Sequence, residues 1–79
     1  MIKEKIKAII NEIQPLDIDL DIAKNLVSGD YLDSFNVLML IHNLEAAFNV
    51  KLEFNGPIAD QLDSIEQIEK LIVDSKSSA

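Results

Sequence analysis

The sequence contains no cysteine and no tryptophan, only two glycines and two prolines, and no long apolar run. Without cysteine the chain forms neither disulfides nor thiolate metal sites. No segment is long and apolar enough to span a membrane, and the first residues alternate charge with single apolar side chains instead of forming the apolar centre of a signal peptide. These absences predict a soluble, cytoplasmic protein that does not insert into a membrane.

The chain is strongly acidic, because it has fourteen acidic and seven basic residues and therefore a formal net charge of −7. Such a surface repels nucleic-acid phosphates and anionic lipid headgroups, and it attracts basic patches on protein partners. It also serves simply to keep a small protein soluble, and composition does not decide between these readings. A chain of 79 residues that is 48% apolar predicts one folded domain without a nucleic-acid partner.

Apolar residues recur at helical spacing along most of the chain. Isoleucines predict a first helix over Ile2–Gln14, which Pro15 ends. A second helix is expected over Ser34–Asn49, capped by Asp33 or Ser34. Its apolar residues Val37, Leu40, Ile41, Leu44 and Phe48 form one stripe, and Leu38 and Met39 fall outside it.

The last third of the sequence predicts shorter elements. Val50, Leu52 and Phe54 alternate with charged residues and favour a short extended stretch, followed by a turn at Asn55-Gly56. Pro57 is suited to open a short helix that ends at Leu62. Ser64-Ile65-Glu66-Gln67 matches a capping box and opens a last helix. The prediction is an all-α, small antiparallel bundle of three main helices plus one short helix, with a domain over 1–75 and a frayed tail over 76–79.

The connection between the first two helices, residues 15–33, is long for a small domain. Its apolar side chains are too many for an unpacked linker, and we expect them on the core: Leu16, Ile18, Leu20, Leu26, Val27 and Leu32. A packed connection of this length is uncommon and usually functional. Its opening, Asp17-Ile18-Asp19-Leu20-Asp21, begins like a calcium loop, but Ile22 and Ser28 occupy the positions that need glycine and glutamate. A calcium site is therefore rejected.

Ser34 is the residue with the clearest chemical potential. A hydroxyl at the start of a helix lies beside unpaired backbone N–H groups and the positive end of the helix dipole, which favours an attached phosphate. Asp33 could help to hold the Mg²⁺ that accompanies phosphate transfer. The pair Asp-Ser is common before helices, however, and by itself predicts only a cap. Such a serine can be modified by another enzyme and needs no base of its own.

Four blocks of the sequence resemble the acyl and peptidyl carrier protein family. Residues 29–35, Gly-Asp-Tyr-Leu-Asp-Ser-Phe, resemble the Asp-Ser-Leu signature of that family, and residues 16–19 resemble the loop that leaves its first helix. Residues 44–50 are similar to the end of its second helix, and residues 63–68 to the start of its last helix. The resemblance covers Ile6 to Val73, and the placement of all four blocks at family spacing makes it specific.

The resemblance implies a stand-alone acyl carrier protein rather than an enzyme. A phosphopantetheinyl transferase would move a 4′-phosphopantetheine arm from coenzyme A to the Ser34 oxygen, beside Asp33, and form a phosphodiester. The thiol of the arm would hold acyl intermediates as thioesters, in fatty-acid-type synthesis or a dedicated biosynthetic pathway of secondary metabolism. The implied partners are an acyl- or aminoacyl-loading ligase and downstream synthase enzymes, and the carrier would be a monomer.

The sequence departs from the family pattern along the second helix. Phe35 replaces the usual leucine, and the positions that are often acidic in fatty-acid carriers hold Asn36, Leu38, Met39, His42, Glu45 and Ala46. We therefore expect partners to dock on a largely apolar surface formed by Phe35, Leu38, Met39, His42, Glu45 and Ala46. The alternative is that Leu38 and Met39 belong to the core. The loss of acids favours a dedicated pathway, or an aminoacyl carrier of D-alanyl or peptidyl type.

A different class of function also fits the sequence. An unmodified acidic helical adaptor could bind a protein through the apolar second helix. An enzyme is disfavoured, because His42 is the single histidine and no base–nucleophile pair or set of metal ligands is visible.

Overall fold

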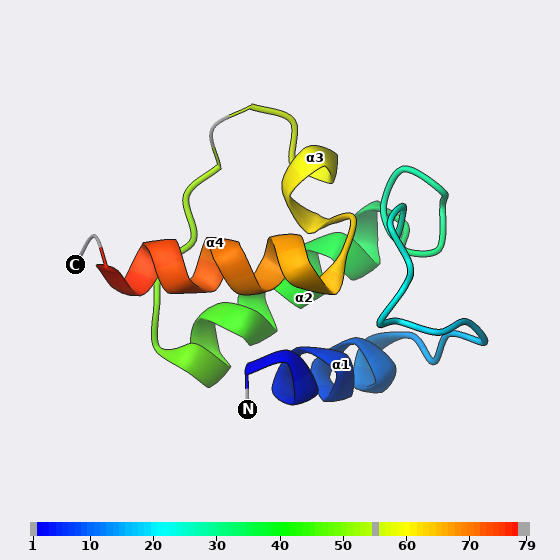
Figure 1. The fold of residues 1–79 in the computed structure, drawn as a ribbon, viewed down its shortest axis with the longest axis horizontal. Helices are drawn as coiled ribbons and strands as arrows, with labels where there is room; N and C mark the ends of the chain where they lie inside the picture. Colours follow the sequence, from blue (N-terminus) through cyan, green and yellow to red (C-terminus); the bar gives the residue numbers. More distant parts are fainter. Residues whose placement is uncertain (1, 55, 78–79) are drawn as a thin grey trace.

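The computed structural model describes residues 2–54 and 56–77, and within them it contains four helices and no strand. The helices are α1 (Ile2–Ile13), α2 (Ser34–Phe48), α3 (Ala59–Leu62) and α4 (Ile65–Ser77). In Figure 1, α2 and α4 run in one direction and α1 runs in the opposite direction. Helix α1 packs against both α2 and α4, and α3 packs against α4. The predicted all-α architecture, with three longer helices and a short one, is confirmed for these residues. None of these helices is long and apolar enough to cross a membrane.

Helix α1 forms because its isoleucines fall on one side. Ile6, Ile9 and Ile10 are buried, whereas Glu4, Lys5 and Glu12 on the other side of the helix are exposed. The helix ends at Ile13, one residue before the predicted end. Gln14 N still donates to Ile10 O at 2.9 Å, and Pro15 supplies no N–H with which to continue the pattern.

Both ends of helix α2 are set by the residues that adjoin it. Asp33 is extended and its carboxylate accepts a hydrogen bond from Asn36 N at 2.8 Å, so Asp33 is the N-cap. Asn49 adopts the left-handed conformation (φ 54°) and its N–H donates to Glu45 O. Asparagine tolerates this conformation better than most residues, which ends the helix at Phe48 rather than at the predicted Asn49.

Residues 50–54, for which the sequence favours an extended stretch without a sheet, form no regular element. Leu52 is nevertheless buried, and its N–H donates to Glu45 Oε2 at 2.9 Å. The side-chain carboxylate thus replaces the backbone partner that a neighbouring strand would supply. Of the predicted turn, Asn55 lies outside the described residues, and Gly56 has a φ of +115°, which glycine adopts readily.

Helix α3 is shorter than predicted, since it begins at Ala59 and not at Pro57. Pro57 O accepts from Asp60 N at 3.2 Å, so Pro57 begins a tight turn that precedes the helix.

Helix α4 begins as predicted, with Ser64 Oγ accepting from Gln67 N at 3.2 Å. The Gln67 side chain bonds back to Ser64, since its Oε1 accepts from Ser64 Oγ at 3.2 Å. Its Nε2 donates to Asp60 O at 2.7 Å and ties α4 to α3. Helix α4 extends to Ser77, so the first two residues of the predicted tail are helical, and residues 78–79 lie outside the described part.

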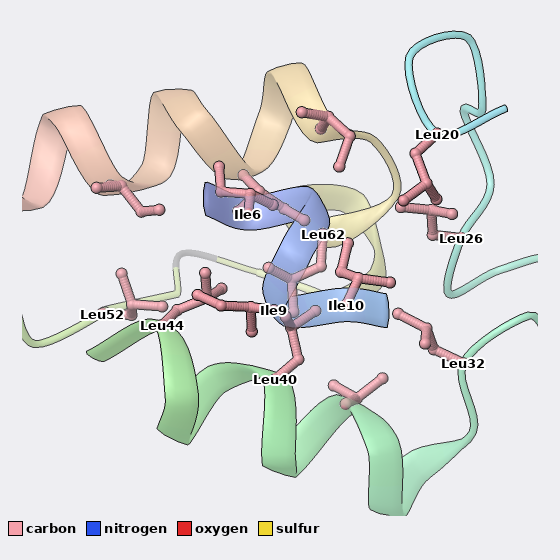
Figure 2. Close-up of a cluster of buried hydrophobic side chains, with 14 residues drawn as sticks. Ile6, Ile9, Ile10, Leu20, Leu26, Leu32, Leu40, Leu44, Leu52 and Leu62 are labelled. Carbon is pink, nitrogen blue, oxygen red and sulfur yellow. The ribbon is translucent and has the colours of Figure 1, made fainter. Parts of the chain in front are cut away.

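The long connection over residues 14–33, here called loop 1, packs on the core as predicted. Leu20, Leu26 and Leu32 are buried, and Leu16, Ile18 and Val27 are partly buried against the same cluster. Figure 2 shows Leu20, Leu26 and Leu32 extending the core beyond the side chains of the helices. Lys7 Nζ also joins α1 to the loop at 3.0 Å from Asp21 Oδ1. This hydrogen bond raises the pKa of Lys7 above its ordinary value.

One turn of loop 1 requires glycine because the backbone approaches itself closely. Gly29 N donates to Asn25 O at 2.8 Å, and a Cβ at Gly29 would lie only 2.6 Å from that same oxygen. We predict that Gly29→Ala lowers the free energy of unfolding by about 1–3 kcal/mol, the usual range for an overpacked site. Urea denaturation measures the loss, and Ser28→Ala, at an exposed neighbour, is the control. Equal midpoints for the two variants would show that the turn has room for a side chain.

Candidate functional site

Ser34 is the first residue of α2 and is exposed. Asp33 is the N-cap, so of the two predicted alternatives Asp33 is confirmed and Ser34 is wrong. The Ser34 hydroxyl is not needed to cap the helix. The backbone N–H groups of the first turn and the positive end of a 15-residue helix lie beside the hydroxyl. An oxygen in this position suits the attachment of an anionic group such as a phosphate.

A surface hollow of about 480 Å³ lies next to Ser34. Its polar lining comes from Asp30, Asp33 and Ser34. Its apolar lining comes from loop 1, from the first turns of α2 and from the segment before α3: Val27, Leu32, Val37, Leu38 and Ile58. A hollow with an apolar wall and a hydroxyl at its edge can shelter an apolar group that is tethered to that hydroxyl.

The residue that sequence reasoning missed is Asp63, between α3 and α4. Its Oδ1 accepts hydrogen bonds from Val27 N and Ser28 N, both at 2.9 Å, and its carbonyl accepts from Leu26 N at 2.9 Å. Three consecutive N–H groups of loop 1 are therefore bound by one residue. In the sequence Asp63 appears only as part of the start of the last helix. The available signal was an aspartate directly before a serine that itself caps the next helix.

The outward face of α2 is apolar near Ser34. Phe35 is 68% exposed, Leu38 65% and Met39 39%. His42 and Ala46 are also exposed, and these five positions share one side of the helix, opposite the buried Val37, Leu40 and Leu44. Leu38 and Met39 are therefore surface residues and not core. Leu38 also lines the hollow, so the apolar face and the hollow are continuous.

Glu45 and Asn36 lie at the edges of this face and differ from its other members. Both are half-buried. The Glu45 carboxylate accepts the hydrogen bond of Leu52 N, which gives it a role inside the fold. The outward side of α2 consequently presents almost no carboxylate apart from Asp33 at its start.

Two acidic residues of loop 1, Asp19 and Asp21, bind groups of the protein itself. Asp19 Oδ1 accepts from Asp21 N at 3.0 Å, and Asp21 pairs with Lys7. Across residues 2–54 and 56–77, no three His, Cys, Asp or Glu side chains come together in a way that could hold a metal ion. The site consists of the Ser34 hydroxyl at a helix start, the carboxylates of Asp30 and Asp33, and apolar walls.

No protein-family model, no curated protein and no solved structure matches this chain. A functional hypothesis therefore depends on its residues and on their arrangement.

Proposed function

We propose that this chain is an acyl carrier protein that bears a 4′-phosphopantetheine arm on Ser34. The observation that carries the proposal is the exposed hydroxyl at the first position of α2, with Asp33 as the cap and an apolar hollow beside it. The resemblance of four sequence blocks to acyl and peptidyl carriers supports the same function. The carrier itself catalyses nothing.

In the loading step a bond forms between Ser34 Oγ and the phosphorus that links pantetheine to the rest of coenzyme A. The P–O bond to the adenosine bisphosphate breaks, this group leaves with the electron pair, and the hydroxyl proton passes to a base of the transferase. The start of α2 stabilises the resulting phosphodiester through its N–H groups and its dipole. Asp33 Oδ1 is occupied by Asn36 N, and its other carboxylate oxygen is the one suited to a Mg²⁺ during transfer.

The lining of the hollow indicates which class of cargo it would favour. The arm, once attached, supplies a thiol that holds the cargo as a thioester. Val27, Leu32, Val37, Leu38 and Ile58 offer an apolar wall, with carboxylates near its edge. Burial of an apolar acyl chain against such a wall is favourable, by about 25 cal/mol per Å² of apolar area removed from water. A charged aminoacyl group gains nothing comparable, so we favour acyl over aminoacyl cargo.

The partners are a phosphopantetheinyl transferase, a loading ligase and synthase enzymes. The exposed face of Phe35, Leu38 and Met39 suits partners with an apolar docking pocket, since large apolar anchors supply most of the affinity at such interfaces. This face lacks the row of acids that serves fatty-acid carriers, which favours a dedicated biosynthetic pathway.

The same exposed face supports a second candidate, an unmodified adaptor that binds protein through α2. Intact-mass spectrometry separates the two functions. The purified chain is incubated with coenzyme A and a promiscuous transferase, beside a known carrier. The carrier function requires that the chain gains the mass of one phosphopantetheine. If only the known carrier gains mass, the adaptor becomes the better interpretation.

A prediction concerns the docking face itself. Leu38→Glu or Met39→Glu is expected to reduce the rate of modification at low carrier concentration by about fivefold or more, the effect of losing roughly 1 kcal/mol of contact energy. The melting temperature should change little because both side chains are exposed. Ala8→Glu, at an exposed position of α1, is the charge-matched control. Equal slowing by Ala8→Glu would attribute the effect to charge and not to the apolar face.

A further inference from the structure

Asp63 connects two parts of the chain that both contribute to the lining of the hollow. Val27 and Leu32 of loop 1 line it. Ile58 lines it from the segment that leads into α3, and Asp63 directly follows α3 at Leu62. The three hydrogen bonds from Leu26 N, Val27 N and Ser28 N to Asp63 join these two parts.

The other hydrogen bonds of this turn do not make that connection. Gly29 N donates to Asn25 O, Asp30 N to Val27 O and Leu32 N to Leu26 O, so these bonds stay within loop 1. They shape the turn but do not fix its distance from α3. The side chain of Leu26 adds apolar contact, because it is fully buried in the core. Asp63 therefore provides the hydrogen bonds that hold this turn of loop 1 against the junction between α3 and α4.

The chemistry of the contact makes a strong clamp. A carboxylate oxygen that accepts two backbone N–H groups forms charge-assisted bonds, which are stronger than bonds between neutral groups. Asparagine at this position would retain an oxygen of the same placement without the charge. Alanine would leave two N–H groups without a partner while keeping the bond between Leu26 N and the backbone carbonyl.

We propose that Asp63 is a positioning residue that holds loop 1 against the α3–α4 junction and so maintains the hollow beside Ser34 in which an apolar acyl group would lie. The effect of Asp63 on an acyl cargo rests on the proposed carrier function, whereas the hydrogen bonds from loop 1 to Asp63 do not depend on that function. Water reaches a thioester more slowly when the attached chain lies in an intact hollow. Asp63 therefore governs how long an acyl cargo survives between partners.

The first experiment uses the unmodified protein, so it remains decisive even if Ser34 carries nothing. Amide hydrogen exchange is measured for Val27 and Ser28, with Leu40 in α2 as an internal reference for global opening. In Asp63→Ala these two amides are expected to exchange at least tenfold faster relative to Leu40, because each loses a charge-assisted bond. Asp63→Asn should fall between Asp63→Ala and the wild type. Asp60→Ala, which removes an exposed acid from α3, should match the wild type.

The second experiment uses the loaded carrier with an octanoyl thioester. Its hydrolysis is expected to be several-fold faster in Asp63→Ala, slightly faster in Asp63→Asn, and unchanged in Asp60→Ala. Unchanged exchange at Val27 and Ser28, or faster exchange with unchanged hydrolysis, would overturn the proposal. If Asp63→Ala does not fold, Asp63→Asn decides, and wild-type exchange in that variant overturns the clamp. Failure of the chain to accept the arm would count against the carrier function alone, because the exchange experiment tests the clamp separately.

Discussion

Replacing Leu26 with alanine is expected to lower the free energy of unfolding by about 2–5 kcal/mol, although Leu26 belongs to no helix. Its side chain is 0% exposed and extends the core that the helices share. The substitution removes buried apolar atoms and leaves a cavity that the surrounding side chains fill only in part. For a small domain, whose total stability is of the order of 5–15 kcal/mol, this is a large loss.

Urea denaturation followed by circular dichroism measures this change. Ile22→Ala is the matched control, because Ile22 lies in the same loop and is 72% exposed. That variant should stay within about 0.5 kcal/mol of the wild type, as surface substitutions usually do. If both variants lose the same small amount, loop 1 is a flexible linker and the packing of its leucines contributes little.

Replacing Ser34 with alanine is expected to abolish transfer of the arm from coenzyme A while leaving the fold unchanged. The reaction needs the hydroxyl oxygen as the atom that bonds to phosphorus. The fold does not need it, because Ser34 is exposed and Asp33 supplies the capping hydrogen bond to Asn36 N. The expected result is complete loss of the mass gain with little change in melting temperature.

The control for this experiment is Ser28→Ala, an exposed serine at the turn of loop 1 that contributes its backbone N–H and not its hydroxyl to Asp63. It should be modified at the rate of the wild type. Residual modification of Ser34→Ala would mean that another side chain accepts the arm. A large fall in the melting temperature of Ser34→Ala would instead mean that the hydroxyl has a structural role.

The helices were predictable because their signals are local. Isoleucine spacing and Pro15 located α1, and the Ser64–Gln67 pattern located the start of α4. Helix ends were less certain, because they depend on single residues whose conformation the sequence does not specify. Asn49 ends α2 by adopting a left-handed conformation, and a tight turn from Pro57 O to Asp60 N delays α3.

The hydrogen bonds made by acidic side chains were not predictable from the sequence. The bonds from Asp63 Oδ1 join residues 35 and 36 positions apart, and no local pattern identifies such partners. Alternation at Val50, Leu52 and Phe54 suggested extended structure, but no neighbouring strand is present in residues 2–54 and 56–77, and Glu45 takes the Leu52 N–H instead. For the same reason Glu45 was predicted as a docking residue without any sign of its internal bond.

The site was partly predictable. The placement of Ser34 at the start of α2 and the capping by Asp33, one of two alternatives, came from sequence spacing. The exposure of Leu38 and Met39 required the structure, since only the packing of α2 against α1 decides which side is outward. The hollow beside Ser34 could not be predicted, because it forms where residues 27–38 meet Ile58, which is distant in sequence.

We propose Ser34 as the attachment site of a phosphopantetheine arm. Fragmentation mass spectrometry of peptides from the chain, after incubation with coenzyme A and a promiscuous transferase, tests it most directly. We expect one adduct per chain, located on Ser34. An adduct on Ser28 or Ser64, or no adduct while a known carrier in the same reaction is modified, would contradict it.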